Sequence, residues 1–370
     1  MEKALEAFTQ LPQVESIRSR EATRVSAILK SGLGVELEAV SPENYPFALQ
    51  YVTGSKEHNI RLQDMARQKG YRLGQNGLFK ENMPVSCMSE NEIYSNLGLD
   101  PIPPELREDR GEFEASGRRC LPLLVDADEI RGIFHVHTTR SDGRNTLEEM
   151  VNEAARAGYQ YVGISDHSQS AFYAHGLKEE DIRQQHADID RLQKTFPHIR
   201  IFKGIESDIL ENGDLDYPEE LLASFDFIIG SIHSRFKMTE AEMTKRLLRA
   251  MDNPYLTILG HMTGRLLLSR TAYSFNLDAV FQKAKVKNII IELNANPHRL
   301  DIDWKECKKL KEYGLQVSIN PDAHAIEHIY FTGYGVGIAR KGWLTSREVF
   351  NTLPLAEMEK TLKSRRPVLG

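Results

Sequence analysis

Short apolar runs alternate with helical patterns from residue 131 onward. Most of the runs are continuous rather than alternating, as expected for strands that are buried on both faces of a parallel sheet. The helical pattern TLEEMVNEAARA, for example, ends at Gly158. Seven strands with intervening helices predict a closed or nearly closed (β/α) barrel, and a doubly wound open sheet is the alternative. The runs cover residues 131–136, 159–165, 199–205, 226–232, 256–260, 288–293 and 316–320.

The first part of the chain has a different pattern. Residues 1–95 contain a helix-like opening, an alternating stretch at 34–40 and a helical segment that ends at Gly70. The stretch DPIPPELREDRGEFEASGRR contains three prolines and many charged residues, which is typical of an extended connector. We therefore expect a small α+β region over 1–95, a linker over 96–130 and a barrel domain over 131–370.

Composition narrows the possible partners and compartments. The formal net charge of −6 excludes a uniformly basic nucleic-acid binder, so any contact with a polyanion must be local or run through metal ions. The three cysteines, Cys87, Cys120 and Cys307, form no CxxC pair, which suits a reducing compartment. No signal peptide and no apolar run of about 20 residues is present. We expect a cytoplasmic protein without a membrane partner.

Histidines and carboxylates gather where the apolar runs end. In a parallel barrel all of these positions lie on the rim formed by the carboxyl ends of the strands, where active sites are built. No glycine-rich dinucleotide-binding motif and no P-loop motif follows any run, so the sequence does not support a dinucleotide-binding domain or a P-loop nucleotide site. The residues at the run ends are His135, His137, Asp142, Asp166, His167, Glu206, His233, His261, Glu292, Asn294, Asn296, Asp322 and His324.

Each residue alone has a plain structural alternative. A single histidine after a strand is more often hydrogen-bonded than a metal ligand, and Asp142 or Asp322 alone fits a helix or turn cap. Six of the twelve histidines nevertheless follow predicted strands. Independent structural histidines would not collect on one rim, so we expect a metal site.

The donor types indicate which metals and which chemistry. Imidazole and carboxylate without thiolate suit Zn²⁺, Mn²⁺ or Fe²⁺ and disfavour Mg²⁺ or Ca²⁺ as the sole occupant. The number of donors suits two to three divalent ions. Clustered divalent ions activate water near neutral pH and hold phosphate oxygens as charge builds on them, so hydrolysis of a phosphate ester is expected.

The rim motifs resemble the PHP (polymerase and histidinol phosphatase) superfamily. The matching motifs are HVHTTRSDG, SDH, GIE, SIHS, GHMTGR and DAH. The resemblance implies a distorted (β/α)7 barrel with a three-metal site. It assigns one ion to His135, His137, Glu206 and Asp322, a second to Glu206, His233 and His261, and a third to Asp142, His167 and His324.

The N-terminal part resembles the bacterial family X DNA polymerases, in which a polymerase module precedes a PHP domain. The resemblance is carried by ALQYVTGSKEHNIRLQDMARQKGYRLGQNGLF and IYSNLGLDPIPPELREDRGEFEA. YVTGS matches the thumb motif around the nucleotide sugar, which implies nucleotide or DNA contacts at Tyr51, Gly54 and Ser55, although Val52 replaces the usual Phe. Ser55 also fits a helix N-cap, and both roles are compatible.

The polymerase part departs from the family pattern. Family X polymerases need three palm carboxylates, and this chain offers at most Glu36, where the family has Asp. Without the paired acids, the catalytic metals and the triphosphate have no cradle. The chain thus resembles an N-terminally truncated form with a palm remnant and thumb over 1–95, and we expect no template-directed nucleotide addition by it alone. A fragment, a split gene product and a degenerate paralogue all fit.

The resemblance implies a metal-dependent DNA phosphodiesterase, a 3′–5′ exonuclease that cleans 3′ ends in DNA repair. Its partners would be gapped or single-stranded DNA and a partner polymerase fragment. Two alternatives stay open: a small-molecule phosphomonoesterase of the histidinol phosphatase type and a non-catalytic DNA-binding or scaffold module. The candidate catalytic residues are Glu206, His233 and Asp322, with Arg265 and Arg299 either holding phosphate oxygens or forming rim salt bridges.

Overall fold

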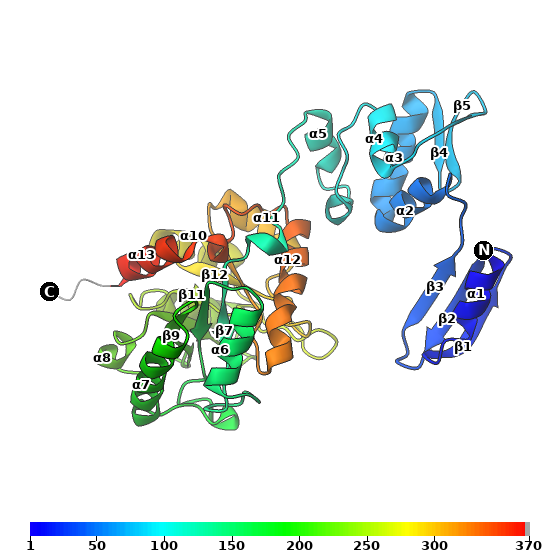
Figure 1. Ribbon diagram of the computed structural model, residues 1–370. Coiled ribbons are helices and arrows are strands. Elements are labelled where there is room, and N and C mark those ends of the chain that lie inside the picture. Colours follow the sequence, from blue (N-terminus) through cyan, green and yellow to red (C-terminus); the bar gives the residue numbers. More distant parts are fainter. Residues whose placement is uncertain (367–370) are drawn as a thin grey trace. The chain divides into compact units, whose positions relative to one another are not determined.

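The computed structural model describes residues 1–366 and divides the chain into two compact units, Met1–Leu121 and Pro122–Gly370 (Figure 1). The first unit is α+β, as predicted. Within residues 1–366, no helix is both long and apolar enough to cross a membrane. The first unit contains α1 (Glu2–Thr9), β1 (Val14–Arg20), β2 (Arg24–Leu29), β3 (Gly34–Glu38), α2 (Tyr45–Thr53), α3 (Lys56–Gln68), β4 (Tyr71–Gly74), β5 (Gly77–Lys80), β6 (Met83–Val85), α4 (Glu90–Asn96) and α5 (Glu112–Gly117).

Two antiparallel three-stranded sheets, β1–β2–β3 and β4–β5–β6, belong to this unit. Helix α3 begins after Ser55, whose side chain accepts a hydrogen bond from the backbone N–H of His58 at 3.1 Å. This is the N-cap that the sequence allowed. A small apolar core forms from Phe47, Leu78 and Ile93.

The segment expected to be an extended linker, 96–130, contains short helical elements and buried side chains. It carries α5 and short 3₁₀ turns at Pro104–Leu106 and Ala127–Glu129. Its first part, up to Leu121, belongs to the first unit. Proline and charge content suggested a connector, but Glu112 is fully buried because His58 pairs with it, Nδ1 to Oε1 at 2.7 Å.

A nearly closed parallel barrel forms the second unit, as predicted, and the open-sheet alternative is wrong. The strands follow one another in the order β7 to β13 around the sheet. The two outer strands are linked beyond their ends, where the N–H of Ala323 donates to the carbonyl of His135 and the N–H of His137 donates to the carbonyl of Ala323. The strands are β7 (Gly132–Val136), β8 (Tyr161–Ile164), β9 (Arg200–Asp208), β10 (Phe227–Ser231), β11 (Ile258–Leu259), β12 (Ile290–Asn294) and β13 (Val317–Asn320).

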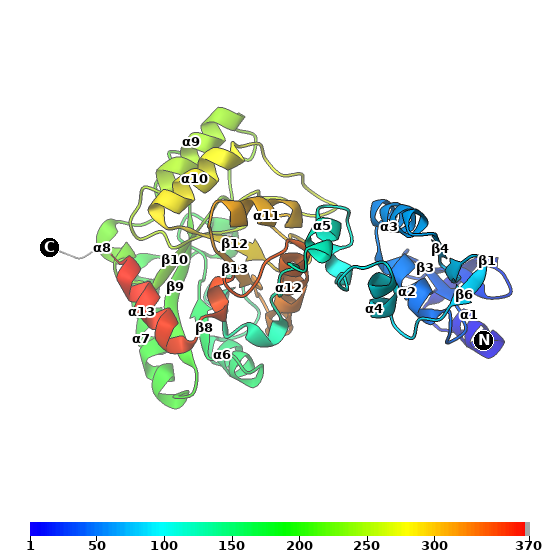
Figure 2. The same cartoon turned by 90° about the horizontal axis from the view of Figure 1, so that it is seen from above.

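Helices surround the barrel (Figures 1 and 2). Two of them begin with reciprocal capping boxes, Thr146 with Glu149 and Thr239 with Glu242, which fix where the chain turns from loop into helix. The helices of this unit are α6 (Leu147–Arg156), α7 (Glu179–Thr195), α8 (Glu219–Leu222), α9 (Glu240–Ala250), α10 (Leu277–Lys287), α11 (Trp304–Glu312), α12 (Thr332–Lys341) and α13 (Leu355–Arg365).

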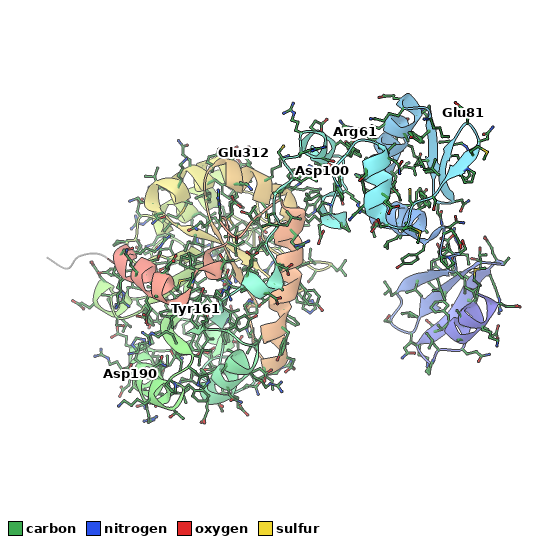
Figure 3. All side chains as sticks on the ribbon, turned by 45° about the horizontal axis from the view of Figure 1, so that its top comes forward. Arg61, Glu81, Asp100, Tyr161, Asp190 and Glu312 are labelled. Carbon is green, nitrogen blue, oxygen red and sulfur yellow. The ribbon has the colours of Figure 1, made fainter. Side chains whose placement is uncertain are left out.

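An aromatic core supports the barrel below the rim. Phe134, Tyr161 (labelled in Figure 3) and Phe227 are buried together and pack with residues of α13. A Cβ at Gly204 would lie 2.2 Å from the ring of Phe227, so only glycine leaves room for this ring. Close packing here gives the rim residues of the neighbouring strands a rigid base.

Candidate metal centre

The end of β7 places the first two histidines. The pairing of β7 with β8 slips between Ile133 and Val136, and His135 adopts a left-handed backbone conformation with φ +61°. The irregularity is a bulge-like turn at the end of the strand. The rings of His135 and His137 consequently approach to 5.1 Å between centroids. Asp322, after β13, is also left-handed, with φ +51°. Strained backbone at non-glycine residues is common at functional sites.

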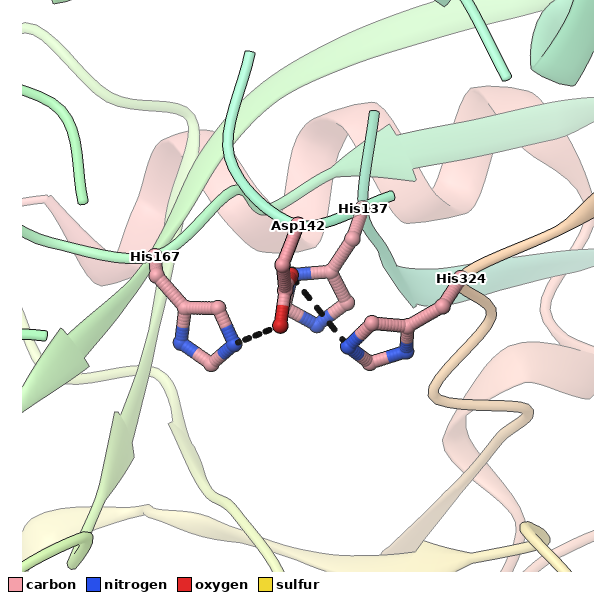
Figure 4. A group of neighbouring side chains, drawn as sticks. All are labelled: His137, Asp142, His167 and His324. Carbon is pink, nitrogen blue, oxygen red and sulfur yellow. Dashed lines mark ion pairs between the residues drawn. The ribbon is translucent and has the colours of Figure 1, made fainter. Parts of the chain in front are cut away.

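All nine predicted ligand positions come together at the carboxyl ends of the strands. Their donor atoms form overlapping groups in which every atom lies within 4.8 Å of the others. Figure 4 shows the group that includes Asp142. The groups are His137, Asp142, His167 and His324; His135, His137 and Asp322; His135, Glu206 and His261; and His167, Glu206 and His233.

Glu206 lies at the centre of the cluster. Its carboxylate is 1% exposed and lies between 2.9 and 3.6 Å from nitrogen atoms of five histidines. A carboxylate in this position could bridge two ions, and this role, which the resemblance implies, stays a prediction. The division of the nine donors among individual ions stays a prediction, because four of them each belong to two of the groups: His135, His137, His167 and Glu206.

Buried imidazole nitrogens test whether metal ions fit this site. Among the described residues, Nε2 of His135, both ring nitrogens of His137, Nδ1 of His167 and Nδ1 of His261 are buried without a hydrogen-bond partner. Such orphaned groups are costly in a protein interior. A divalent ion supplies the partner that these nitrogens lack, and the mixed imidazole and carboxylate donors suit a transition metal. The residues therefore fit a divalent metal centre.

The histidines of the cluster differ in pKa: burial opposes the charge of each ring, yet nearby carboxylates raise the pKa of His135, His167 and His233, whereas two other histidines have a lowered pKa. Burial, together with the nearby His324 and His167, lowers the pKa of His137 to about 3. Burial and the positive charge of Arg299 lower the pKa of His261 to about 4. Both imidazoles are thus neutral near pH 7 and keep a lone pair for a metal. Burial opposes ionisation of Glu206, yet the surrounding histidines hold its pKa well below the usual value.

Two further carboxylates orient histidines of the cluster by contacting their Nδ1 atoms, on the side of the ring that faces away from Glu206. Glu292 lies 2.6 Å from Nδ1 of His135, and Asp208 lies 2.6 Å from Nδ1 of His233. Each contact directs the Nε2 atom of its histidine toward Glu206. This carboxylate–histidine pairing fixes ring orientation and raises the basicity of a metal ligand. The sequence analysis noted Glu292 at a strand end but missed Asp208, whose signal was its position two residues after Glu206 on β9.

Asp166 holds the loop that carries Asp142. Its buried carboxylate accepts hydrogen bonds from the backbone and hydroxyl groups of Thr138, from Ser141 and from Gln185. It belongs to none of the groups of candidate metal donors in the described part of the chain. Its contacts give it a structural role between β7 and α7.

The two candidate arginines differ. Arg299 lies at the cluster, with its Nε 3.1 Å from Oδ2 of Asp322. All three guanidinium nitrogens of Arg265 donate instead to the neighbouring loop: to the carbonyl groups of Arg299 and Leu300 and to Asp303 at 2.8 Å. The contacts of Arg265 support the rim salt-bridge alternative, because its hydrogen-bonding groups are engaged in holding the loop.

The candidate nucleotide-binding residues lie in the first unit, where α2 ends and α3 begins. Tyr51 is 40% exposed, and Asn59 donates to its carbonyl group. A Cβ at Gly54 would lie 2.7 Å from Oδ1 of Asn59, which explains the glycine without a ligand. Ser55 is the N-cap described above. Nucleotide contacts at Tyr51, Gly54 and Ser55 stay a prediction.

The fold and the site together define a (β/α)7-barrel protein with a histidine- and carboxylate-rich metal centre on its carboxyl rim. Two family descriptions match the chain: the DNA polymerase beta thumb over residues 48–108 and the PHP domain over residues 134–296. The chain belongs to the PHP family and combines its PHP domain with a polymerase thumb. This combination confirms the resemblance to the family X polymerases that carry a PHP domain.

Relatives of two kinds match this chain. It is 38% identical over 362 residues to the DNA polymerase/3′-5′ exonuclease PolX of Bacillus subtilis, covering 97% of this chain and 63% of that protein. It is 32% identical over 201 residues to a probable phosphatase of Clostridium acetobutylicum, covering 52% and 78%. A crystal structure of histidinol phosphate phosphatase from Lactococcus lactis, complexed with zinc, L-histidinol and phosphate, covers 58% of this chain and 94% of its own, with 19% identity and a TM-score of 0.45.

Asp208→Asn tests the role of the carboxylates behind the histidines. The amide lacks the negative charge of the carboxylate and offers one acceptor oxygen instead of two, so Nδ1 of His233 is held less strongly and the ring loses its fixed orientation. We expect metal affinity and hydrolysis to fall about 10- to 100-fold. Metal titration and steady-state kinetics measure the change, and Asp190→Asn, at an exposed aspartate on α7 (labelled in Figure 3), is the matched control. Equal behaviour of the two variants would contradict the assigned role.

Proposed function

We propose that this chain is a metal-dependent DNA phosphodiesterase that acts as a 3′–5′ exonuclease and cleans 3′ ends in DNA repair. The observation that carries the proposal is the set of nine converging donors with orphaned imidazole nitrogens. The similarity to a protein named DNA polymerase/3′-5′ exonuclease supports the choice of a DNA substrate. The thumb match supports contact with DNA, in gapped or single-stranded form.

The proposed cofactors are two to three Mn²⁺ or Zn²⁺ ions, with Fe²⁺ as a further candidate. When bound, such ions generate a nucleophile from water near neutral pH and offset the charge of the phosphate. The holding residues would be the nine donors, and the catalytic positions proposed among them are Glu206, His233 and Asp322.

Three further residues of the site would orient the metal-binding histidines or supply positive charge for the phosphate. Glu292 and Asp208 keep His135 and His233 in the tautomer that directs Nε2 into the cluster. Arg299 is fixed by Asp322 and would hold a non-bridging phosphate oxygen. Preorganised charge of this kind lowers the barrier because it does not reorganise during the reaction.

A second candidate function is a small-molecule phosphomonoesterase. It is favoured by the relatives named probable phosphatases, which match 51–64% of this chain at 26–32% identity. The same metal centre would serve both reactions, so substrate preference separates them.

A side-by-side assay tests the proposal. The purified chain, loaded with Mn²⁺, is given a labelled oligonucleotide and a set of phosphomonoesters, with and without chelator. Chelator-sensitive shortening of the oligonucleotide from its 3′ end is the expected result. Hydrolysis of monoesters alone would favour the second candidate. Loss of neither substrate would contradict both and favour a non-catalytic DNA-binding or scaffold module that docks on a partner polymerase fragment.

A further inference from the structure

Two exposed aromatic side chains lie on the loop after β8, and one of them, Tyr173, is next to the metal centre. Phe172 and Tyr173 follow β8 in a short 3₁₀ turn and are 86% and 65% exposed. The ring of Tyr173 meets two candidate metal ligands edge to face, at 6.0 Å from the ring of His167 and 6.2 Å from the ring of His233. Tyr173 therefore lies at the mouth of the metal centre, where a substrate must enter.

The loop that carries these rings is fixed by hydrogen bonds on both sides. Before the turn, the backbone and hydroxyl groups of Ser170 donate to the carboxylate of Asp216 at 2.6 and 2.5 Å. After the turn, the N–H of Leu177 donates to the carbonyl of His167 at 2.8 Å. A Cβ at Gly176 would lie 1.8 Å from the carbonyl oxygen of Ser168, so the two ends of the loop are in closest contact there. The aromatic rings are thus presented on a preorganised support.

The charges around the loop indicate where a phosphate and where an uncharged group would bind. An open hollow of about 780 Å³ borders Phe172, and Lys178 lines it together with three carboxylates at the start of α7, Glu179, Glu180 and Asp181. This acidic lining disfavours phosphate. A phosphate instead suits the metal centre and Arg299. An uncharged, flat group suits the aromatic rings.

We propose that Tyr173 and Phe172 form a stacking platform for the base of the 3′-terminal nucleotide while its phosphodiester lies at the metal centre. The inference rests on the proposed function and names the feature that would make the site prefer nucleic acid over small phosphoesters. Stacking of bases on aromatic side chains tolerates every base, because each base has a π-face. The platform therefore acts on any 3′-terminal sequence.

The test compares two oligonucleotides that differ only in the terminal base. One ends in a normal nucleotide and the other in an abasic residue, so the reacting phosphate is the same. For the Mn²⁺-loaded chain, Tyr173→Ala and Phe172→Ala should lower kcat/KM about 5- to 100-fold on the normal end, mainly through KM, and change the abasic end little. Tyr173→Phe should retain the activity, because the ring remains. Tyr334→Ala, at a 57% exposed tyrosine on α12, is the control.

The outcomes separate this inference from the proposed function. A loss confined to the base-bearing end supports the platform. Equal losses on both ends, or no loss on either, would overturn it while leaving the exonuclease proposal in place. If the unsubstituted chain hydrolyses neither oligonucleotide, the proposed function fails and the platform fails with it.

Discussion

Glu206→Ala is expected to lower phosphodiester hydrolysis by at least about 10³-fold, or about 4 kcal/mol of transition-state stabilisation. The carboxylate lies within 3.6 Å of nitrogens from five histidines, so no other side chain can take its place. Its loss also leaves the cluster with less negative charge to hold divalent ions. Steady-state kinetics on an oligonucleotide with added Mn²⁺ measures the effect.

Two further variants make this result specific. Glu206→Gln keeps the shape of the side chain but loses its charge, and it should be almost as inactive. Glu312→Ala changes an exposed glutamate at the end of α11, labelled in Figure 3, and should leave the rate unchanged. Activity of the glutamine variant within about tenfold of the unsubstituted chain would show that the charge of Glu206 is not needed.

Glu112→Ala is expected to destabilise the first unit by about 1–3 kcal/mol, because it leaves Nδ1 of His58 buried without its hydrogen-bond partner. Both side chains are fully buried, and Glu112 also accepts hydrogen bonds from the backbone N–H groups of Asp109 and Arg110. Hydrogen exchange of peptides from α3 and α5 reports on this unit within the full chain. Exchange there should accelerate strongly.

The matched control for this prediction is Glu114→Ala on the same helix. Glu114 is 49% exposed in its pair with Arg61, which Figure 3 labels, and exposed pairs contribute about 0–1 kcal/mol. Similar acceleration of exchange in both variants would contradict the importance of the buried pair.

The same pair predicts how the stability of the first unit depends on pH. Burial of Glu112 opposes its charge, but hydrogen bonds from His58 and the backbone hold its pKa below the usual value. The folded state therefore binds the proton more weakly than the unfolded state. The resulting stability is fully present above about pH 5 and is lost as pH falls through the folded pKa. Denaturant unfolding between pH 7 and pH 3 should show this loss, and Glu112→Ala should lack it.

The barrel could be predicted because its strands are recognisable in the sequence. The strands are largely buried on both faces and therefore form continuous apolar runs in the sequence. Because the carboxyl ends of parallel barrel strands lie on one rim, the nine donors at these ends are expected to lie together. The bulge at His135 could not be predicted, because it depends on a pairing slip with β8. Asp208 was missed because its role depends on His233, 25 residues away in sequence. The possible role of Phe172 and Tyr173 could not be predicted, because it depends on the contact of Tyr173 with His167 in the folded chain.

The linker illustrates a different limit of sequence reasoning. Prolines and charges between 96 and 130 suggested an extended connector, yet Ile102, Leu106 and Phe113 are buried and α5 forms among them. The charged residue that decides the packing, Glu112, pairs with His58, 54 residues earlier. Local composition carries no information on such a distant partner. A buried, hydrogen-bonded carboxylate therefore cannot be told from a solvated one in the sequence.

Metal content tests the central claim most directly. Elemental analysis of the full chain, purified without chelator and loaded with Mn²⁺ or Zn²⁺, should find two to three ions per chain. Glu206→Ala should retain at most one, because the carboxylate is expected to bridge two ions, and Glu312→Ala should retain all of them. A content near zero after loading, or an unchanged content in Glu206→Ala, would contradict a metal centre built around Glu206.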